Sequence, residues 1–229
     1  MGLQDDFSAR QPIFRAPASV IGLIALLAAA HAARVFAPKP WPDRILDDYA
    51  LNPLAYLGGD LFHQAVPPFS HMLLHADWTH LAINCAWLLA FGPVVARRFG
   101  DTAFLAFFIL CGVAGAAAFV ALDWGQGVGA IGASGAISGL MGAAIRMMDV
   151  ANPYLNLTTR PLAPLFSRQV MLFSAVFLVL NLLSGLFGFF LVGPGQSIAW
   201  QDHLGGYLAG LLLASLFERY LRPQARFRS

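Results

Sequence analysis

Six apolar stretches, separated by segments rich in charge, proline or glycine, constrain the fold of this chain more than any other feature. They run from about 18 to 36, 79 to 96, 102 to 122, 131 to 148, 170 to 192 and 202 to 221. A transmembrane helix needs about 20 apolar residues to cross a hydrocarbon core about 30 Å thick. Composition agrees, because 58% of the 229 residues are hydrophobic and only 11% are charged. The sequence therefore predicts an all-α membrane protein with six transmembrane helices.

The segments outside these stretches divide the chain into three predicted regions. Residues 1–17 form a polar N-terminal segment, residues 18–221 the membrane domain, and residues 222–229 a basic tail. Within the domain, 37–69 is half apolar and rich in proline, which predicts an ordered first outer loop lying at the membrane interface. Ala30-His31-Ala32 resembles a signal-peptide cleavage site. The length and late start of the first apolar run instead favour a retained helix.

The arginine and lysine residues are distributed unevenly between the two sides of the predicted bundle. Three lie on one side: Arg34, Lys39 and Arg44. Eleven lie on the side that holds both termini: Arg10, Arg15, Arg97, Arg98, Arg146, Arg160, Arg168, Arg219, Arg222, Arg226 and Arg228. Cytoplasmic loops carry the excess of positive charge. We therefore expect a multi-pass protein of the cell membrane, of the bacterial inner-membrane type, with both termini in the cytoplasm.

The sequence gives little support for a disulfide framework, a thiolate metal site or nucleic-acid binding. Cys85 and Cys111 both fall inside apolar stretches, which indicates packing rather than a disulfide or a thiolate metal site. The chain has no basic patch for nucleic acid. We expect no cofactor and no metal, and the lipid bilayer as the surroundings of the protein. The sequence leaves the oligomeric state open.

The fourth stretch opens with Gly132-Ala133-Ser134-Gly135. A serine becomes a nucleophile only when a base takes its proton and donors stabilise the oxyanion. His203 begins the sixth stretch on the same predicted outer side, and it shares one helix face with Gly206 and Gly210. Gly135, Gly139 and Gly142 form a matching stripe. Packing the two stripes would bring Ser134 and His203 together. The alternative is that the small residues only allow close helix packing, and that the histidine forms a hydrogen bond between helices without taking part in any reaction.

Two polar residues of the second stretch are candidates for stabilising an oxyanion. His80 and Asn84 are four residues apart, so they share one helix face near the same outer depth. Both side chains can donate hydrogen bonds. The backbone N–H of Ser134 is a third candidate, because N–H groups in the first turn of a helix have no partner within that helix.

Together these motifs resemble the rhomboid family of intramembrane serine proteases, from about residue 69 to residue 213. The resemblance lies in the order and spacing of His71, His75, His80, Asn84, Gly132-Ala133-Ser134-Gly135 and His203-Leu204-Gly205-Gly206. It implies a six-helix rhomboid-like bundle that cleaves transmembrane or juxtamembrane peptide bonds of membrane-protein substrates without metal or cofactor. By this resemblance Ser134 is the nucleophile, His203 is the base, and His80 and Asn84 line the oxyanion site.

The chain departs from the family pattern at three positions. Ser138 stands four residues after the nucleophile, where many members carry an aromatic residue that supports the histidine. Asp202 precedes the histidine in place of the usual alanine. Adjacent helical residues diverge by about 100°, so Asp202 is not expected to be a third catalytic residue. Trp41 is followed by Pro42, so the Trp-Arg pair common in the first outer loop is absent.

Two other functions stay open at this point. A catalytically inactive rhomboid-like protein could bind membrane clients, although such relatives lose the serine or the histidine. A metal-dependent membrane protein is suggested by His71 and His75, yet no His-Glu-x-x-His motif occurs. We interpret those two histidines as structural residues that tie the loop to the second helix.

For a protease, clients would enter beside the fifth stretch. Phe187, Phe189 and Phe190 lie next to the helix break Gly193-Pro194-Gly195. This break could let the fifth helix tilt and act as a lateral gate. The sequence does not identify the client.

Overall fold

The computed structural model describes residues 16–58, 60–148, 160–192 and 198–221, apart from the side chains of 188–192. The long helices are α1 (Ala18–Val35), α5 (Trp78–Phe99), α6 (Asp101–Leu122), α7 (Ser134–Met147), α8 (Arg168–Val192) and α9 (Trp200–Leu221). Between α1 and α5 lie the short segments α2 (Trp41–Tyr49), η1 (Pro53–Leu57), α3 (Leu61–Ala65), α4 (Pro67–Ser70) and η2 (His71–Leu73). The described part contains no strand, only an isolated bridge between Leu51 and Ala130. The predicted all-helical fold is confirmed there.

Local sequence signals explain where the helices begin and end. Asp77 caps α5, because its side chain accepts a hydrogen bond of 2.8 Å from the His80 N–H. Gly100, with φ of 86°, ends α5 and turns the chain into α6. Gly132 has φ of 128°, which a helix cannot contain. For this reason α7 begins at Ser134, rather than at residue 131 as the apolar run predicted.

Four described helices are long and apolar enough to cross a membrane: α1, α5, α6, and residues Arg168–Phe187 of α8. A chain with four such helices is a multi-pass membrane protein. Helix α7 has only 14 residues, fewer than the about 20 that a span requires. Helix α9 has 22 residues but carries Asp202 near its beginning and Glu218 and Arg219 near its end.

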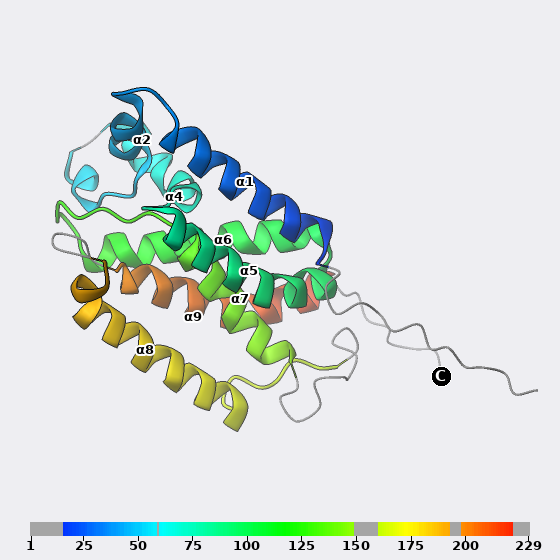
Figure 1. The fold of residues 1–229 in the computed structure, drawn as a ribbon. Helices are drawn as coiled ribbons and strands as arrows, with labels where there is room; N and C mark the ends of the chain where they lie inside the picture. Colours follow the sequence, from blue (N-terminus) through cyan, green and yellow to red (C-terminus); the bar gives the residue numbers. More distant parts are fainter. Residues whose placement is uncertain (1–15, 59, 149–159, 193–197, 222–229) are drawn as a thin grey trace, which may run out of the picture.

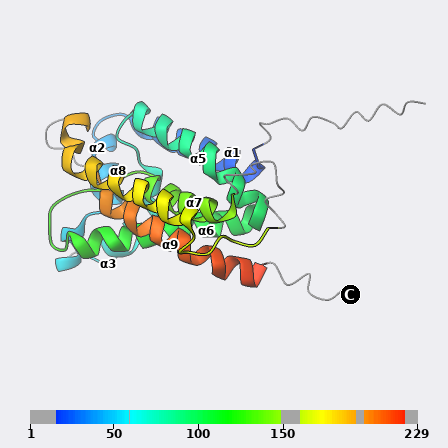
Figure 2. The same ribbon diagram turned by 90° about the horizontal axis from the view of Figure 1, so that it is seen from below.

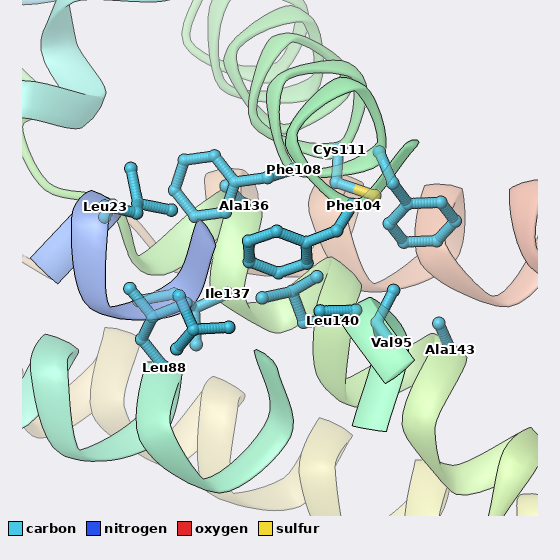
Figure 3. Close-up of a cluster of buried hydrophobic side chains, with 14 of the residues drawn as sticks. Leu23, Leu88, Val95, Phe104, Phe108, Cys111, Ala136, Ile137, Leu140 and Ala143 are labelled. Carbon is cyan, nitrogen blue, oxygen red and sulfur yellow. The ribbon is translucent and has the colours of Figure 1, made fainter. Parts of the chain in front are cut away.

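Helix α7 lies in the middle of the bundle and contributes to the largest buried cluster (Figures 1 and 3). Phe104 of α6 and Leu140 of α7 are completely buried there, between side chains of α1 and α5. Nearly every residue of α7 is buried, many of them small. A short helix enclosed on its sides in this way does not have to satisfy the thickness of the bilayer by itself.

Polar contacts join the helices at each end of the bundle. At one end, the Arg34 side chain donates a hydrogen bond of 2.7 Å to the His75 carbonyl oxygen. Gln201 at that end donates to Asp123 over 2.7 Å. At the opposite end, Arg98 of α5 forms an ion pair of 2.8 Å with Glu218 of α9. Gly132 donates to the His71 carbonyl oxygen and Asp202 lies beside His71, so the beginnings of α7 and α9 meet at the end that also holds the segment between α1 and α5.

Helix α8 runs along the edge of the bundle beside α9 (Figures 1 and 2). Many of its described apolar side chains are exposed, including Val176, Leu180 and Leu186. Its contact with α9 includes the stacked rings of Phe177 and Tyr207, whose centroids are 4.1 Å apart. Helix α8 thus has one packed face and a broad apolar face that is exposed.

Candidate active site

The first residue of α7 and the fourth residue of α9 meet at this end of the bundle. His203 Nε2 lies 2.8 Å from Ser134 Oγ, and both side chains are partly buried. The two residues are 69 positions apart in the chain. A serine hydroxyl at this distance from an imidazole nitrogen has the geometry that proton transfer between them requires.

Glycines allow the two helices to approach closely enough for this contact. A methyl group on Gly206 would overlap the carbonyl oxygen of Gly135, and one on Gly210 would overlap that of Gly139. The backbones of α7 and α9 are therefore in direct contact, without side chains between them. The structure brings together the two glycine stripes noted in the sequence.

A residue that the sequence analysis did not identify also contacts His203. Asn181 of α8 places its Oδ1 at 3.0 Å from His203 Nδ1. Its Nδ2 donates a hydrogen bond of 2.8 Å to the Trp200 carbonyl oxygen, which fixes the orientation of the amide. Oδ1 can only accept, so the proton of His203 lies on Nδ1 and Nε2 is free to accept the Ser134 proton. The signal available in the sequence was an asparagine within the apolar run 170–192.

His80 lies beside Ser134, across the backbone of Gly132. A methyl group built on Gly132 would lie 3.0 Å from His80 Nε2 and 3.5 Å from Ser134 Oγ. The other ring nitrogen, Nδ1, accepts a hydrogen bond of 3.3 Å from the Ala76 N–H. This contact assigns the His80 proton to Nε2, and Nε2 and Ser134 Oγ both lie close to Gly132.

Asn84 lies one turn further along α5 and is buried. Its Nδ2 donates a hydrogen bond of 2.9 Å to the His80 carbonyl oxygen. Its Oδ1 is buried without a hydrogen-bond partner among the described residues. One amide N–H of Asn84 is therefore used within α5, and the other can serve a second acceptor.

Asp202 points toward the loop before α5. Its Oδ1 lies 3.7 Å from His71 Nε2, and both side chains are buried. Its carboxylate also packs against Gly135, where an added methyl group would lie 2.5 Å from Oδ1. His71 in turn places Nδ1 at 2.8 Å from the Pro67 carbonyl oxygen. The Gly132 N–H donates to the His71 carbonyl oxygen over 2.9 Å, which ties this loop to the beginning of α7.

His75 lies in the same loop and is completely buried. Burial, with further contributions from the nearby His80 and His31, lowers the pKa of His75 to about 3. Its ring is therefore neutral at neutral pH. Within the described residues, no three His, Cys, Asp or Glu side chains come together in a way that could hold a metal ion.

The remaining positions singled out in the sequence lie around the site or outside the described part. Ser138 is buried on α7, one turn beyond Ser134. Trp41 is half exposed and lies against Arg44, whose guanidinium carbon is 5.7 Å from the ring centroid. Phe187 is exposed. The side chains of Phe189 and Phe190, together with residues 193–195, fall outside the described residues.

Comparison with known proteins gives two findings. A family model described as the Rhomboid domain matches residues 63–220, which is more than half of the chain. A curated protein, Rhomboid protease GluP of Bacillus subtilis, is 30% identical over 145 residues, which cover 63% of this chain. The matched region covers 24% of the length of that relative.

Proposed function

This chain belongs to the rhomboid family, and we propose that it is an intramembrane serine endopeptidase acting on membrane-protein substrates. The observation that carries the proposal is the 2.8 Å contact between His203 Nε2 and Ser134 Oγ. Ser134 is the nucleophile and His203 the general base. The hydrogen bond of Asn181 to His203 Nδ1 supports this assignment, because it leaves Nε2 as the acceptor.

The reaction passes through an acyl-enzyme. Ser134 Oγ attacks the carbonyl carbon of the scissile peptide bond while its proton passes to His203 Nε2. The tetrahedral intermediate breaks its C–N bond, and the imidazolium gives that proton to the leaving amine. A water molecule, deprotonated by the same imidazole, then attacks the ester. Collapse releases the carboxyl product and returns the proton to Ser134 Oγ.

Three donors stabilise the oxyanion that develops during each attack. The Nε2–H of His80 is the first donor, because Nε2 and Ser134 Oγ both lie close to Gly132. The backbone N–H of Ser134 belongs to the first turn of α7 and has no partner within that helix. The second amide N–H of Asn84 is the third donor. Loss of one such donor costs about 100- to 1,000-fold in turnover.

In the membrane, α1, α5, α6, α7, α8 and α9 are the six transmembrane helices of the domain 18–221. Both termini, in segments 1–17 and 222–229, face the cytoplasm of a bacterial cell, and the site faces outward. The described Arg97, Arg98 and Arg160 at the end of the bundle opposite the site support this orientation. The segment between α1 and α5 is the first outer loop and lies at the membrane interface.

The substrate is a transmembrane segment that enters from the lipid beside α8. A peptide bond within a helix hides its carbonyl group in the backbone hydrogen bonds, so the segment must unwind locally before attack. Segments with glycine or proline near the cleavage point are therefore preferred. The exposed apolar face of α8 supports entry at this helix, because it borders lipid.

Cleavage of a reporter membrane protein in liposomes tests the proposal. The wild-type protein is expected to cleave a reporter with glycine near the outer end of its transmembrane segment, and added chelator should not change the rate. Ser134→Ala and His203→Gln should each lower the rate by at least about 1,000-fold. A crosslink between α5 and α8 should slow cleavage if clients enter there, and an unchanged rate would refute that route.

The same assay separates the two alternative functions. A wild-type protein that binds the reporter without cutting it would be a catalytically inactive client-binding protein. Cleavage that chelator abolishes, or that Ser134→Ala leaves unchanged, would indicate a different chemistry, as in the metal-dependent alternative.

A further inference from the structure

We propose that Asn181 is a positioning residue that holds His203 in the tautomer and orientation required of a general base. The inference rests on the proposed protease function. Asn181 does not contact the reacting atoms, because its Oδ1 meets the imidazole at Nδ1, 3.0 Å away and on the side opposite Ser134. Asn181 is 5% exposed, so water does not compete freely for these contacts.

Three consecutive hydrogen bonds link Ser134, His203, Asn181 and the Trp200 carbonyl oxygen, and in each the donor lies on the Ser134 side. The Trp200 carbonyl oxygen accepts from Asn181 Nδ2 over 2.8 Å, so the amide cannot be reversed without losing this bond. Asn181 Oδ1 then accepts from His203 Nδ1, and His203 Nε2 accepts from Ser134 Oγ–H. Each hydrogen bond therefore determines which atom of the next residue carries the proton. The order starts from a backbone carbonyl, which has no proton to give.

Asn181 also acts during the chemical step. When His203 takes the Ser134 proton, the imidazolium carries a positive charge, and both of its ring nitrogens are donors. The Oδ1 end of the amide dipole then faces this charge at Nδ1. A neutral amide cannot accept the proton outright, so the proton stays on the imidazole and is available for the leaving amine.

Ser138 and Asp202, two of the positions where this chain departs from the family pattern, do not fill the role. Ser138 is buried one turn along α7, and its small side chain offers no ring against which an imidazole could stack. The Asp202 carboxylate lies by His71, at 3.7 Å from that ring. The departure of this chain at position 138 thus coincides with support for the histidine from a different helix.

Because Asn181 lies on α8, the orientation of the base depends on how α8 lies against α9. Asn181 contacts two residues of α9, through Trp200 and His203. Two turns earlier on α8, the Ser174 hydroxyl lies 2.8 Å from the Tyr207 hydroxyl. A displacement of α8 away from α9 would break both contacts and release the imidazole.

Substitution of Asn181 by leucine removes the acceptor while keeping a side chain of similar size. We expect Asn181→Leu to lower kcat for the reporter by about 10- to 100-fold with KM nearly unchanged, because one directed hydrogen bond to the base is lost. Asn181→Asp should recover much of this loss, because a protonated carboxyl group can accept from Nδ1 and donate to the Trp200 carbonyl oxygen. Nitrogen NMR of ¹⁵N-histidine-labelled protein, with His203→Gln for assignment, should find the Nδ1–H tautomer in wild type and a mixture in Asn181→Leu.

Ser174→Ala is the matched control, because it removes a 2.8 Å contact between the same two helices without touching His203. It should keep kcat within about threefold of wild type and leave the tautomer unchanged, as expected for the loss of one partly exposed hydrogen bond. An equal loss in Ser174→Ala, or full activity in Asn181→Leu, would overturn the inference. Full activity in Asn181→Leu together with an inactive Ser134→Ala would leave the protease function standing.

Discussion

Two of the neighbours of helix α9, α7 and α8, are attached to it in different ways in the candidate site. Its contact with α7 is made by backbone, where Gly206 and Gly210 lie against carbonyl oxygens of α7. Its contact with α8 is made by side chains, through the amide of Asn181 and the stacked rings of Phe177 and Tyr207. Ser134 comes from the first neighbour and Asn181 from the second.

The two kinds of contact control two different features of the site, the distance between Ser134 and His203 and the orientation of the His203 ring. A backbone contact leaves no rotatable side chain in between, so the distance between Ser134 and His203 is set by the packing of the core. A side-chain contact can be lost when a peripheral helix moves, because only a few groups have to separate. The distance between Ser134 and His203 therefore depends on core packing, while the orientation of the His203 ring depends on a helix with an exposed apolar face.

The largest expected effect comes from breaking the backbone contact. Gly206→Val places a branched side chain against the carbonyl oxygen of Gly135 and should push α9 away from α7. We expect at least about a 100-fold loss of cleavage, because a displacement of about 1 Å is enough to misalign reacting groups. The free energy of unfolding should fall by about 1 to 3 kcal/mol. Thermal unfolding in detergent and reporter cleavage measure the two effects.

Gly22 of α1 provides the control for that substitution. No atom lies within 4 Å of a methyl group built on Gly22. Gly22→Val should therefore leave both cleavage and unfolding close to wild type. A similar loss in both variants would mean that glycine content, rather than the contact of α7 with α9, is what matters.

A smaller effect, on stability, is expected from His75 in the loop before α5. His75 is neutral in the folded protein because burial lowers its pKa to about 3, whereas the unfolded chain binds a proton near 6.5. The unfolded state therefore holds more protons between these two values, and stability decreases as the pH falls below 6.5. Between pH 6.5 and 5 we expect a loss of roughly 1 to 2 kcal/mol from this residue.

Unfolding of wild type and His75→Asn at pH 7.5 and pH 5 measures this contribution. Acidification should destabilise the wild type more than the variant, because the variant cannot bind the proton. Equal losses in the two proteins would contradict the assignment of His75 as a buried neutral histidine.

Much of the contact between α7 and α9 could be predicted from the sequence. The apolar runs predicted the long helices to within a few residues. Glycines at helical spacing indicated which faces of α7 and α9 could approach. Such stripes are informative because few other residues permit backbone contact.

The attachment of α8 could not be predicted in the same way. This helix is apolar on all sides, so the sequence pattern does not indicate which face packs against the bundle. The contact of Asn181 with His203 depends on the rotation of α8, which tertiary packing decides. The beginning of α7 was missed by three residues because the positive φ of Gly132 interrupts an otherwise apolar run.

Labelling by a fluorophosphonate tests the central claim most directly, because the reagent forms a covalent adduct with a serine whose hydroxyl group is activated. Intact mass and peptide mapping should find one adduct on Ser134 in the wild-type protein and none in Ser134→Ala. His203→Gln should slow labelling by on the order of 100-fold or more, as expected when a general base is removed. An adduct on another serine, or labelling of Ser134 at the same rate without His203, would contradict the account.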